Sequence, residues 1–124
     1  MTTATDNEAI ARRIFEEVWQ NHNYDVNDDL VSEDYVFHDP SMPEDTEWAS
    51  GREGYRMMAE MCAGIIDGTL EFEQVISTRD YVVGRWKQTG THVGKMGNIE
   101  PTNEEVSITG NVIDRFEDGK LVEM

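Results

Sequence analysis

The sequence predicts an α+β fold in a single domain, with helices in the first half and an antiparallel sheet in the second. Three observations support this prediction: apolar residues at helical spacing up to residue 65, strand-like alternation from residue 70 onward, and a length of 124 residues. A chain of this length can bury one hydrophobic core and is too short for two. Helices followed by a meander of strands are typical of α+β folds.

The first helix is expected over residues 6–22. Thr5 and Glu8 have the spacing of a capping box, in which a hydroxyl and a carboxylate satisfy backbone amides at the helix start. Apolar residues then recur at intervals of four: Ile10, Ile14 and Val18. Residues 23–34 place a few apolar residues in an acidic setting, which favours a short second helix that ends at residues 32–34.

A strand and a loop are expected next. The segment YVFHDP at residues 35–40 predicts a strand that Pro40 ends, because proline has no amide to give to a sheet. Residues 40–50 hold two of the three prolines and show no periodicity, which predicts a surface loop with an exposed Trp48. Loops of this length often form the rim of a pocket.

The third helix is expected to begin at Gly51 and to end where Asp67 and Gly68 break the pattern. Its apolar positions are Tyr55, Met58, Met61, Cys62 and Ile65. Four strand-like segments follow: residues 70–78, 81–93, 104–116 and 120–124. Because the connections between them are rich in turn-forming residues, these segments predict an antiparallel meander.

The charge of the chain excludes several kinds of partner. It carries 26 acidic and 10 basic residues, for a formal net charge of −16. This charge repels nucleic acid phosphates and anionic lipid headgroups, so neither nucleic acid nor membrane is expected as a partner. Only three basic residues are lysines, and an acidic, lysine-poor surface resembles halophilic proteins, whose self-repulsion is screened by molar salt.

The sequence predicts a cytoplasmic protein without a cofactor or a metal site. It has no run of about 20 apolar residues that would cross a membrane, and its N-terminus lacks the features of a signal peptide. The single cysteine, Cys62, cannot form an internal disulfide and fits best as a small buried thiol. Three scattered histidines give no zinc spacing, and no glycine-rich phosphate loop is present.

Several segments together resemble the SnoaL-like polyketide cyclases, which belong to the nuclear-transport-factor-2-like superfamily. These segments are EDYVFHDP, GREGYRMMAEM, YVVGRWKQTGTHVG, EVSITG and RFEDGKLVE, in the order that the family shows. The resemblance extends over residues 10–123. It implies a cone in which a curved, mainly antiparallel sheet wraps around the N-terminal helices and encloses an apolar pocket.

The resemblance places a catalytic acid of the family at a position where this chain has Val112. In the cyclases, an aspartate four residues before the phenylalanine of the RF pair acts as acid and base, and valine can do neither. Side chains alternate along a strand, so Asp114 faces the same way as Val112, one repeat farther along. Asp114 is therefore either a relocated acid or a surface carboxylate paired with an arginine, and the sequence leaves both open.

A second candidate base is Asp39, which aligns with the proton-shuttling aspartate of the steroid isomerases of this superfamily. Its alternative role is that of an Asp-Pro turn former. Steroid isomerase chemistry is not expected, because the two oxyanion donors of those enzymes align with Phe15 and Val112. His38 could donate a hydrogen bond to a substrate oxygen or orient a carboxylate. On an alternating strand, His38 and Asp39 face opposite sides.

His92 is the fourth candidate for a catalytic side chain. It shares a strand face with Trp86, which suggests a polar group at the pocket mouth beside an aromatic wall. The alternative is a histidine with a purely structural hydrogen bond. The apolar wall itself is expected to consist of Phe15, Trp19, Met58, Trp86 and Val112.

Two functions are consistent with these residues. The first is a cofactor-free cyclase, or a related lyase or isomerase, that acts on a small apolar carbonyl compound through Asp39 or Asp114. The second is a non-catalytic small-molecule-binding module that has lost the family acid at Val112. The resemblance also implies a homodimer formed through the outer face of the sheet.

Overall fold

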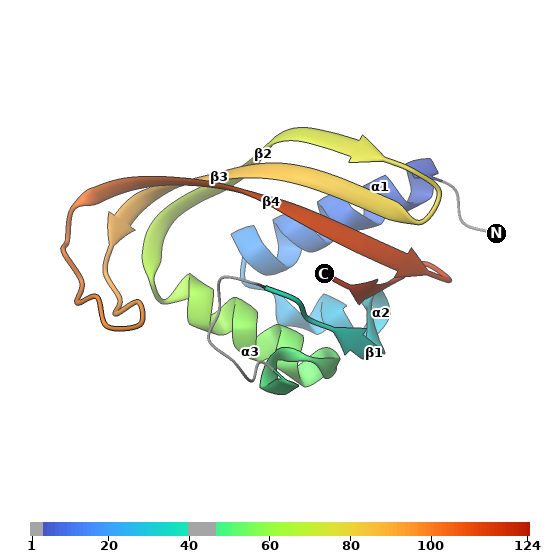
Figure 1. Ribbon diagram of the computed structural model, residues 1–124, viewed down its shortest axis with the longest axis horizontal. Helices are drawn as coiled ribbons and strands as arrows, with labels where there is room; N and C mark the ends of the chain where they lie inside the picture. Colours follow the sequence, from blue (N-terminus) through green and yellow to red (C-terminus); the bar gives the residue numbers. More distant parts are fainter. Residues whose placement is uncertain (1–3, 40–46) are drawn as a thin grey trace.

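The computed structural model describes residues 4–39 and 47–124, in which a curved sheet arches over helices (Figure 1). The helices are α1 (Ala4–Ile14), α2 (Asn27–Leu30) and α3 (Gly51–Ala63). The strands are β1 (Val31–Val36), β2 (Ile66–Ser77), β3 (Tyr81–His92), β4 (Glu105–Glu117) and β5 (Lys120–Glu123). The sheet order is β1-β5-β4-β3-β2, with β1 parallel to β5 and all other pairs antiparallel. The predicted α+β fold and the antiparallel meander are confirmed.

The first helical segment has the expected place but not a uniform geometry. The α-helix ends at Ile14 and continues as a π-helix, η1 (Phe15–Gln20), whose wider turns carry Phe15 and Trp19. A short 3-10 turn, η2 (Tyr24–Val26), then leads into α2. The structure describes no side chain at residue 5, so the capping role expected for Thr5 lies outside the described part of the chain.

The expected end of the second helix at residues 32–34 is wrong, because these residues belong to β1. Helix α2 ends at Leu30, and the strand begins at Val31, which pairs with Leu121 of β5. Val31 is completely buried in this pairing. The local structure at Val31 thus depends on a partner strand residue 90 positions away in the chain. A short-range sequence pattern cannot predict such a pairing.

The expected break at Asp67 and Gly68 is also wrong, since β2 already begins at Ile66. Gly68 pairs with Gly90 of β3, and a Cβ atom added at Gly68 would lie 1.9 Å from the Thr89 carbonyl oxygen. The glycine therefore allows two backbones to approach closely within a strand pair, rather than ending an element. In the expected loop, residues 40–46 lie outside the described residues, and Trp48 is exposed on a 3-10 turn, η3 (Glu47–Ala49).

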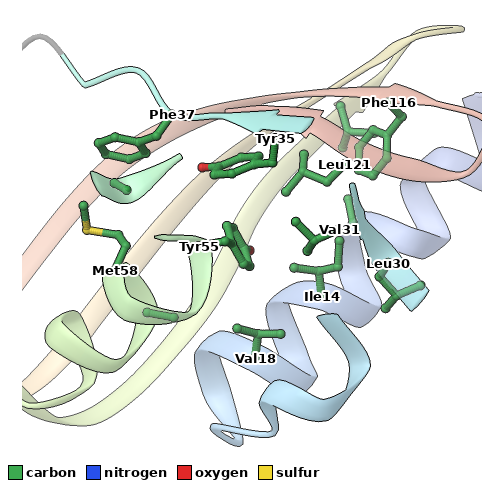
Figure 2. Packing of buried hydrophobic residues seen from close by; sticks show 14 residues of the cluster. Ile14, Val18, Leu30, Val31, Tyr35, Phe37, Tyr55, Met58, Phe116 and Leu121 are labelled. Atoms are coloured by element: carbon green, nitrogen blue, oxygen red, sulfur yellow. The ribbon is translucent and has the colours of Figure 1, made fainter. Parts of the chain in front are cut away.

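The hydrophobic core lies between the helices and the end of the sheet that β1 and β5 complete (Figure 2). Val18 from η1 and Val31 and Leu121 from the paired strands are almost fully buried. The rings of Tyr35 on β1 and Tyr55 on α3 meet edge to face, with centroids 5.0 Å apart. This core fixes α3 against β1 and leaves space between the helices and the long strands.

Candidate functional site

A cavity of about 640 Å³ lies between the helices and the inner face of the long strands. All five residues expected to form its apolar wall line it: Phe15, Trp19, Met58, Trp86 and Val112. They come from η1, α3, β3 and β4, so the bend of the sheet brings them together. A cavity of this size suits a small organic molecule.

The sheet side of the cavity is built from aromatic rings that cover glycines on a neighbouring strand. Phe72 of β2 covers Gly84 of β3, where an added Cβ atom would lie 2.4 Å from the ring. Phe15 of η1 stacks on Phe72, with ring centroids 3.8 Å apart. The Phe72 ring therefore needs a glycine at position 84, because a larger residue there would collide with the ring.

Asp114 lies on the inner face of β4, as the alternation along the strand predicts, and borders the cavity. Its side chain is buried, and its Oδ1 atom has no hydrogen-bond partner among the described residues. Burial raises the pKa of this carboxyl group to about 7. The alternative of a surface carboxylate paired with an arginine is wrong, because the neighbouring Arg115 binds Glu117 and Glu123 instead.

Two tyrosines that the sequence analysis did not assign to the site lie near Asp114. The charge of Asp114 contributes to raising the pKa of both the Tyr35 and Tyr55 hydroxyls, after the larger effect of burial. The Nε1 atom of Trp19 donates a hydrogen bond of 2.7 Å to the Tyr55 hydroxyl. Tyr55 was expected only as an apolar position of the third helix. The tyrosine hydroxyl could have indicated a polar role for this position, since a buried tyrosine needs a hydrogen-bond partner.

A second group of polar side chains lies near the ends of β1 and β5 and also lines the cavity. Asp39 is half-buried and lines the cavity, and its charge contributes to raising the pKa of the Cys62 thiol, after burial. His38 also borders the cavity but is exposed, and its Nε2 atom lies 2.7 Å from Glu123 Oε2. Arg115 and His38 together lower the pKa of Glu123 through hydrogen bonds.

His92 lies apart from the other candidates. It is buried at the end of β3, where its Nδ1 atom accepts a 3.3 Å hydrogen bond from the Thr102 backbone amide. Its Nε2 atom has no partner within the described ranges. Of the four candidate side chains, Asp114, Asp39 and His38 line the cavity. His92 does not.

The described residues offer no site for a metal ion, since nowhere among them do three or more His, Cys, Asp or Glu side chains gather suitably. Cys62 lines the cavity as a half-buried thiol whose Sγ atom lies 3.9 Å from the Met58 sulfur. Burial raises the pKa of this thiol, which keeps it protonated. Within residues 4–39 and 47–124, no helix is long and apolar enough to cross a membrane.

The family model for SnoaL-like polyketide cyclases matches residues 9–124, and the chain therefore belongs to this family. Solved structures share its nuclear-transport-factor-2-like fold. A SnoaL-like protein from Jannaschia sp. CCS1 has a TM-score of 0.83 at 20% identity, with 99% of this chain and 85% of that chain covered. TsrD from Streptomyces laurentii has a TM-score of 0.79 at 17% identity, with 99% of this chain and 87% of that chain covered.

A SnoaL-like polyketide cyclase from Agrobacterium tumefaciens C58 aligns with a TM-score of 0.73 at 19% identity, covering 99% of this chain and 88% of that one. At such low identities these likenesses show the fold alone. No curated protein sequence matches the chain. The roles of the site residues therefore rest on their own geometry.

Proposed function

We propose that this protein catalyses cofactor-free acid/base chemistry, of the intramolecular aldol type, on a small apolar carbonyl compound held in the cavity. One observation carries the proposal: Asp114 is a buried carboxyl group on the cavity wall, one of its oxygens has no hydrogen-bond partner among the described residues, and its pKa is about 7. A carboxyl group with such a pKa can both accept and donate a proton near neutral pH. It occupies the strand face on which the family places its acid, two positions beyond Val112.

The reaction has three steps in which atoms and charges balance. The Asp114 carboxylate removes a proton from the carbon next to a substrate carbonyl, which leaves an enolate and a neutral carboxyl group. The enolate carbon attacks a second carbonyl of the same molecule, forming the new carbon–carbon bond and an alkoxide. Asp114 returns its proton to this alkoxide, which gives the cyclic β-hydroxyketone and restores the carboxylate.

The apolar wall serves this chemistry in two ways. It binds the hydrocarbon part of the substrate by burying its surface. It also excludes water from the carboxyl group, which keeps the pKa of Asp114 high enough for proton transfer in both directions. A module that only bound apolar molecules would be more stable with an apolar residue at position 114, because a buried carboxyl group without partners costs stability.

Asp39 is the second candidate for the base, because it also reaches the cavity. We assign it, together with His38, a role in contacting the polar end of the substrate where β1 and β5 meet. His92 lies outside the cavity, and we assign it to holding the loop that carries Thr102. These assignments make Asp114 the residue whose loss should abolish the chemistry.

Hydrogen exchange at the substrate tests this proposal whatever the cyclic product is. Linear compounds with two or more ketone groups are incubated in D₂O, and NMR follows the exchange of the hydrogens between the carbonyls. We expect Asp114→Asn to lower the exchange rate by roughly 10²- to 10⁴-fold, the usual contribution of a general base. Asp28→Asn is the matched control and should keep the rate, because Asp28 is an exposed carboxylate of α2 outside the cavity lining. Exchange at the wild-type rate in folded Asp114→Asn would overturn the proposal.

We also propose that two copies pair through the outer sheet face, as the family resemblance implies. Ile76, Val83 and Ile113 are directly paired across β2, β3 and β4 and form an apolar row on this face. Ile76 and Ile113 are more than half exposed. Sedimentation equilibrium tests this: Ile113→Glu should convert a dimer to a monomer, and a monomeric wild type would contradict the pairing.

A further inference from the structure

Among the described residues, no protein group accepts the hydrogen of the Tyr55 hydroxyl. The ring is buried on α3 and borders the cavity. The Trp19 indole donates to the Tyr55 oxygen at 2.7 Å, and an indole nitrogen can only donate. The tyrosine oxygen is therefore the acceptor of this bond, and its own hydrogen remains for a different partner. In the described part of the chain, the tyrosine hydroxyl donates to no protein atom.

Two other buried polar atoms near Tyr55 have no hydrogen-bond partner in the described part of the chain. Asp114 Oδ1 on β4 and the Tyr35 hydroxyl on β1 make no hydrogen bond to any described residue. Both tyrosine hydroxyls experience the charge of Asp114, so the three groups lie within electrostatic range of one another. A buried polar atom without a partner destabilises a fold by about 1–3 kcal/mol. Two such atoms, close to a tyrosine hydroxyl whose hydrogen is not used, indicate a place that a ligand oxygen or water completes.

We propose that Tyr55 is a catalytic residue that donates its hydroxyl hydrogen to the substrate oxygen on which negative charge develops, with Trp19 as its positioning residue. The inference rests on the proposed function, because the enolate formed by proton removal carries that charge. The proton of Tyr55 stays on its own oxygen, and only a hydrogen bond forms. This donor comes from α3, and it fills the role for which Phe15 and Val112 have no suitable group.

The hydrogen bond from Trp19 acts on Tyr55 in two ways. It fixes the hydroxyl oxygen in place, so that the donor is already oriented when the substrate binds. It also withdraws electron density from that oxygen, and hydrogen bonds in such a chain strengthen one another. Burial raises the pKa of Tyr55 well above its ordinary value, so the hydroxyl keeps its proton throughout the working range.

Binding of an oxyanion tests the proposal independently of turnover. The probes are 2,4-dinitrophenolate, which carries a negative oxygen, and its neutral methyl ether, which has the same ring. Both are measured by equilibrium dialysis at pH 6, where the Asp114 carboxyl is mainly protonated and does not repel the anion. High, constant salt screens the net charge of the protein. The readout is the ratio of the two affinities.

We expect Tyr55→Phe to lower this ratio by roughly 10- to 100-fold, the usual effect of losing a hydrogen bond to a charged group. Trp19→Phe should lower it less, since the donor remains but loses its orientation. Tyr24→Phe is the matched control, because Tyr24 lies outside the cavity and packs against Arg56. Its ratio should equal that of the wild type. Thermal melts establish that each variant is folded.

An unchanged ratio in folded Tyr55→Phe would overturn the proposal. If Tyr55→Phe does not fold, Trp19→Phe decides alone: a lower ratio supports the role of the pair, and an unchanged one overturns it. The hydrogen exchange assay of Asp114→Asn tests the proposed function separately. Loss of exchange in that variant with an unchanged Tyr55→Phe ratio would reject the tyrosine donor and keep the function.

Discussion

The indole of Trp86 lies over the backbone of Gly110, its direct cross-strand partner on β4. A Cβ atom added at Gly110 would come within 2.4 Å of the indole carbon Cζ2. Phe72 of β2 likewise covers Gly84 of β3, although the direct cross-strand partner of Gly84 is Val75. The shape of the aromatic wall formed by Phe72 and Trp86 therefore depends on having no Cβ atom at Gly84 and Gly110.

Gly110→Ala is expected to destabilise the protein and to reduce the cavity. The methyl group forces the Trp86 ring away from the sheet, and such overpacking typically costs about 1–3 kcal/mol. Urea denaturation measures the loss, and the affinity for 2,4-dinitroanisole reports the change in the cavity. Gly64→Ala is the control, because a Cβ atom there makes only ordinary contacts of 3.6 Å or more. A Gly110→Ala variant as stable as Gly64→Ala would contradict this packing.

Asp114→Asn is expected to make stability less dependent on pH. Burial raises the pKa of Asp114 to about 7 in the folded state, against about 3.9 for an unfolded aspartate. Between these values the folded state retains a proton that the unfolded state has lost, so stability falls as pH rises from about 4 to about 7.

The difference between wild type and Asp114→Asn isolates this effect from the other acidic groups. As pH rises from about 4 to about 7, the free energy of unfolding of the variant minus that of the wild type should increase by on the order of 1 kcal/mol per pH unit. Above about pH 7 this difference should stay constant. Urea denaturation at pH 4, 5, 6, 7 and 8 measures the difference. A difference that does not change with pH would show that the carboxyl group titrates normally.

Val112→Asp is expected to lower stability and to move the proton-transfer profile to higher pH. Positions 112 and 114 share the inner face of β4, about 7 Å apart along the strand. Two carboxyl groups so close in an apolar cavity do not both ionise readily, so the pair holds a proton to higher pH. The cost of burying the second group is about 1–3 kcal/mol.

The pH dependence of substrate hydrogen exchange measures this shift. In the wild type the rate should rise through pH 7 as Asp114 loses its proton, and in Val112→Asp it should rise at a higher pH. Val112→Asn is the control, since a neutral side chain of similar shape leaves the profile in place. Identical profiles for the aspartate and asparagine variants would contradict a coupled pair.

The elements that the sequence predicted best are those whose pattern is local. The meander was predictable because apolar alternation and turn residues lie within the strands and connections themselves. Residues 31–34 were not, since β1 forms by pairing with the distant β5. Gly68 was misinterpreted for a related reason. A glycine that ends an element cannot be told by sequence from a glycine that lets a neighbouring strand approach closely. Only the pairing of Gly68 with Gly90 on β3 shows that the second case applies.

In the candidate site, too, the features set by local sequence patterns were predictable and those set by long-range packing were not. Alternation along β4 placed Asp114 on the inner face, and the family resemblance pointed to that strand. The pairing of Trp19 with Tyr55 was not predictable, because it depends on the π-helical turn of η1 and on how α3 packs. His92 lies on the predicted face of β3. It misses the cavity because its ring turns to the Thr102 amide.

Salt is expected to stabilise the fold. The net charge of −16 on 124 residues favours expansion, and screening weakens this repulsion. Thermal melts from low to molar potassium chloride should show a steadily rising Tm. A variant with three exposed acidic groups neutralised (Glu16→Gln, Asp28→Asn and Glu104→Gln) should start from a higher Tm and gain less from salt. A Tm independent of salt in the wild type would reject the halophilic interpretation.

The parallel pairing of β1 with β5 has a consequence for the order of folding. His38 and Glu123, which meet where these strands end, are 85 positions apart in the chain. Closing so long a loop is entropically costly, whereas each hairpin of the meander closes locally. The β2–β3–β4 hairpins should therefore form early and β1 should dock late. Pulsed hydrogen exchange during refolding would then protect the amides of β3 before those of β1, and the ligand-binding cavity would mature only in that last kinetic phase.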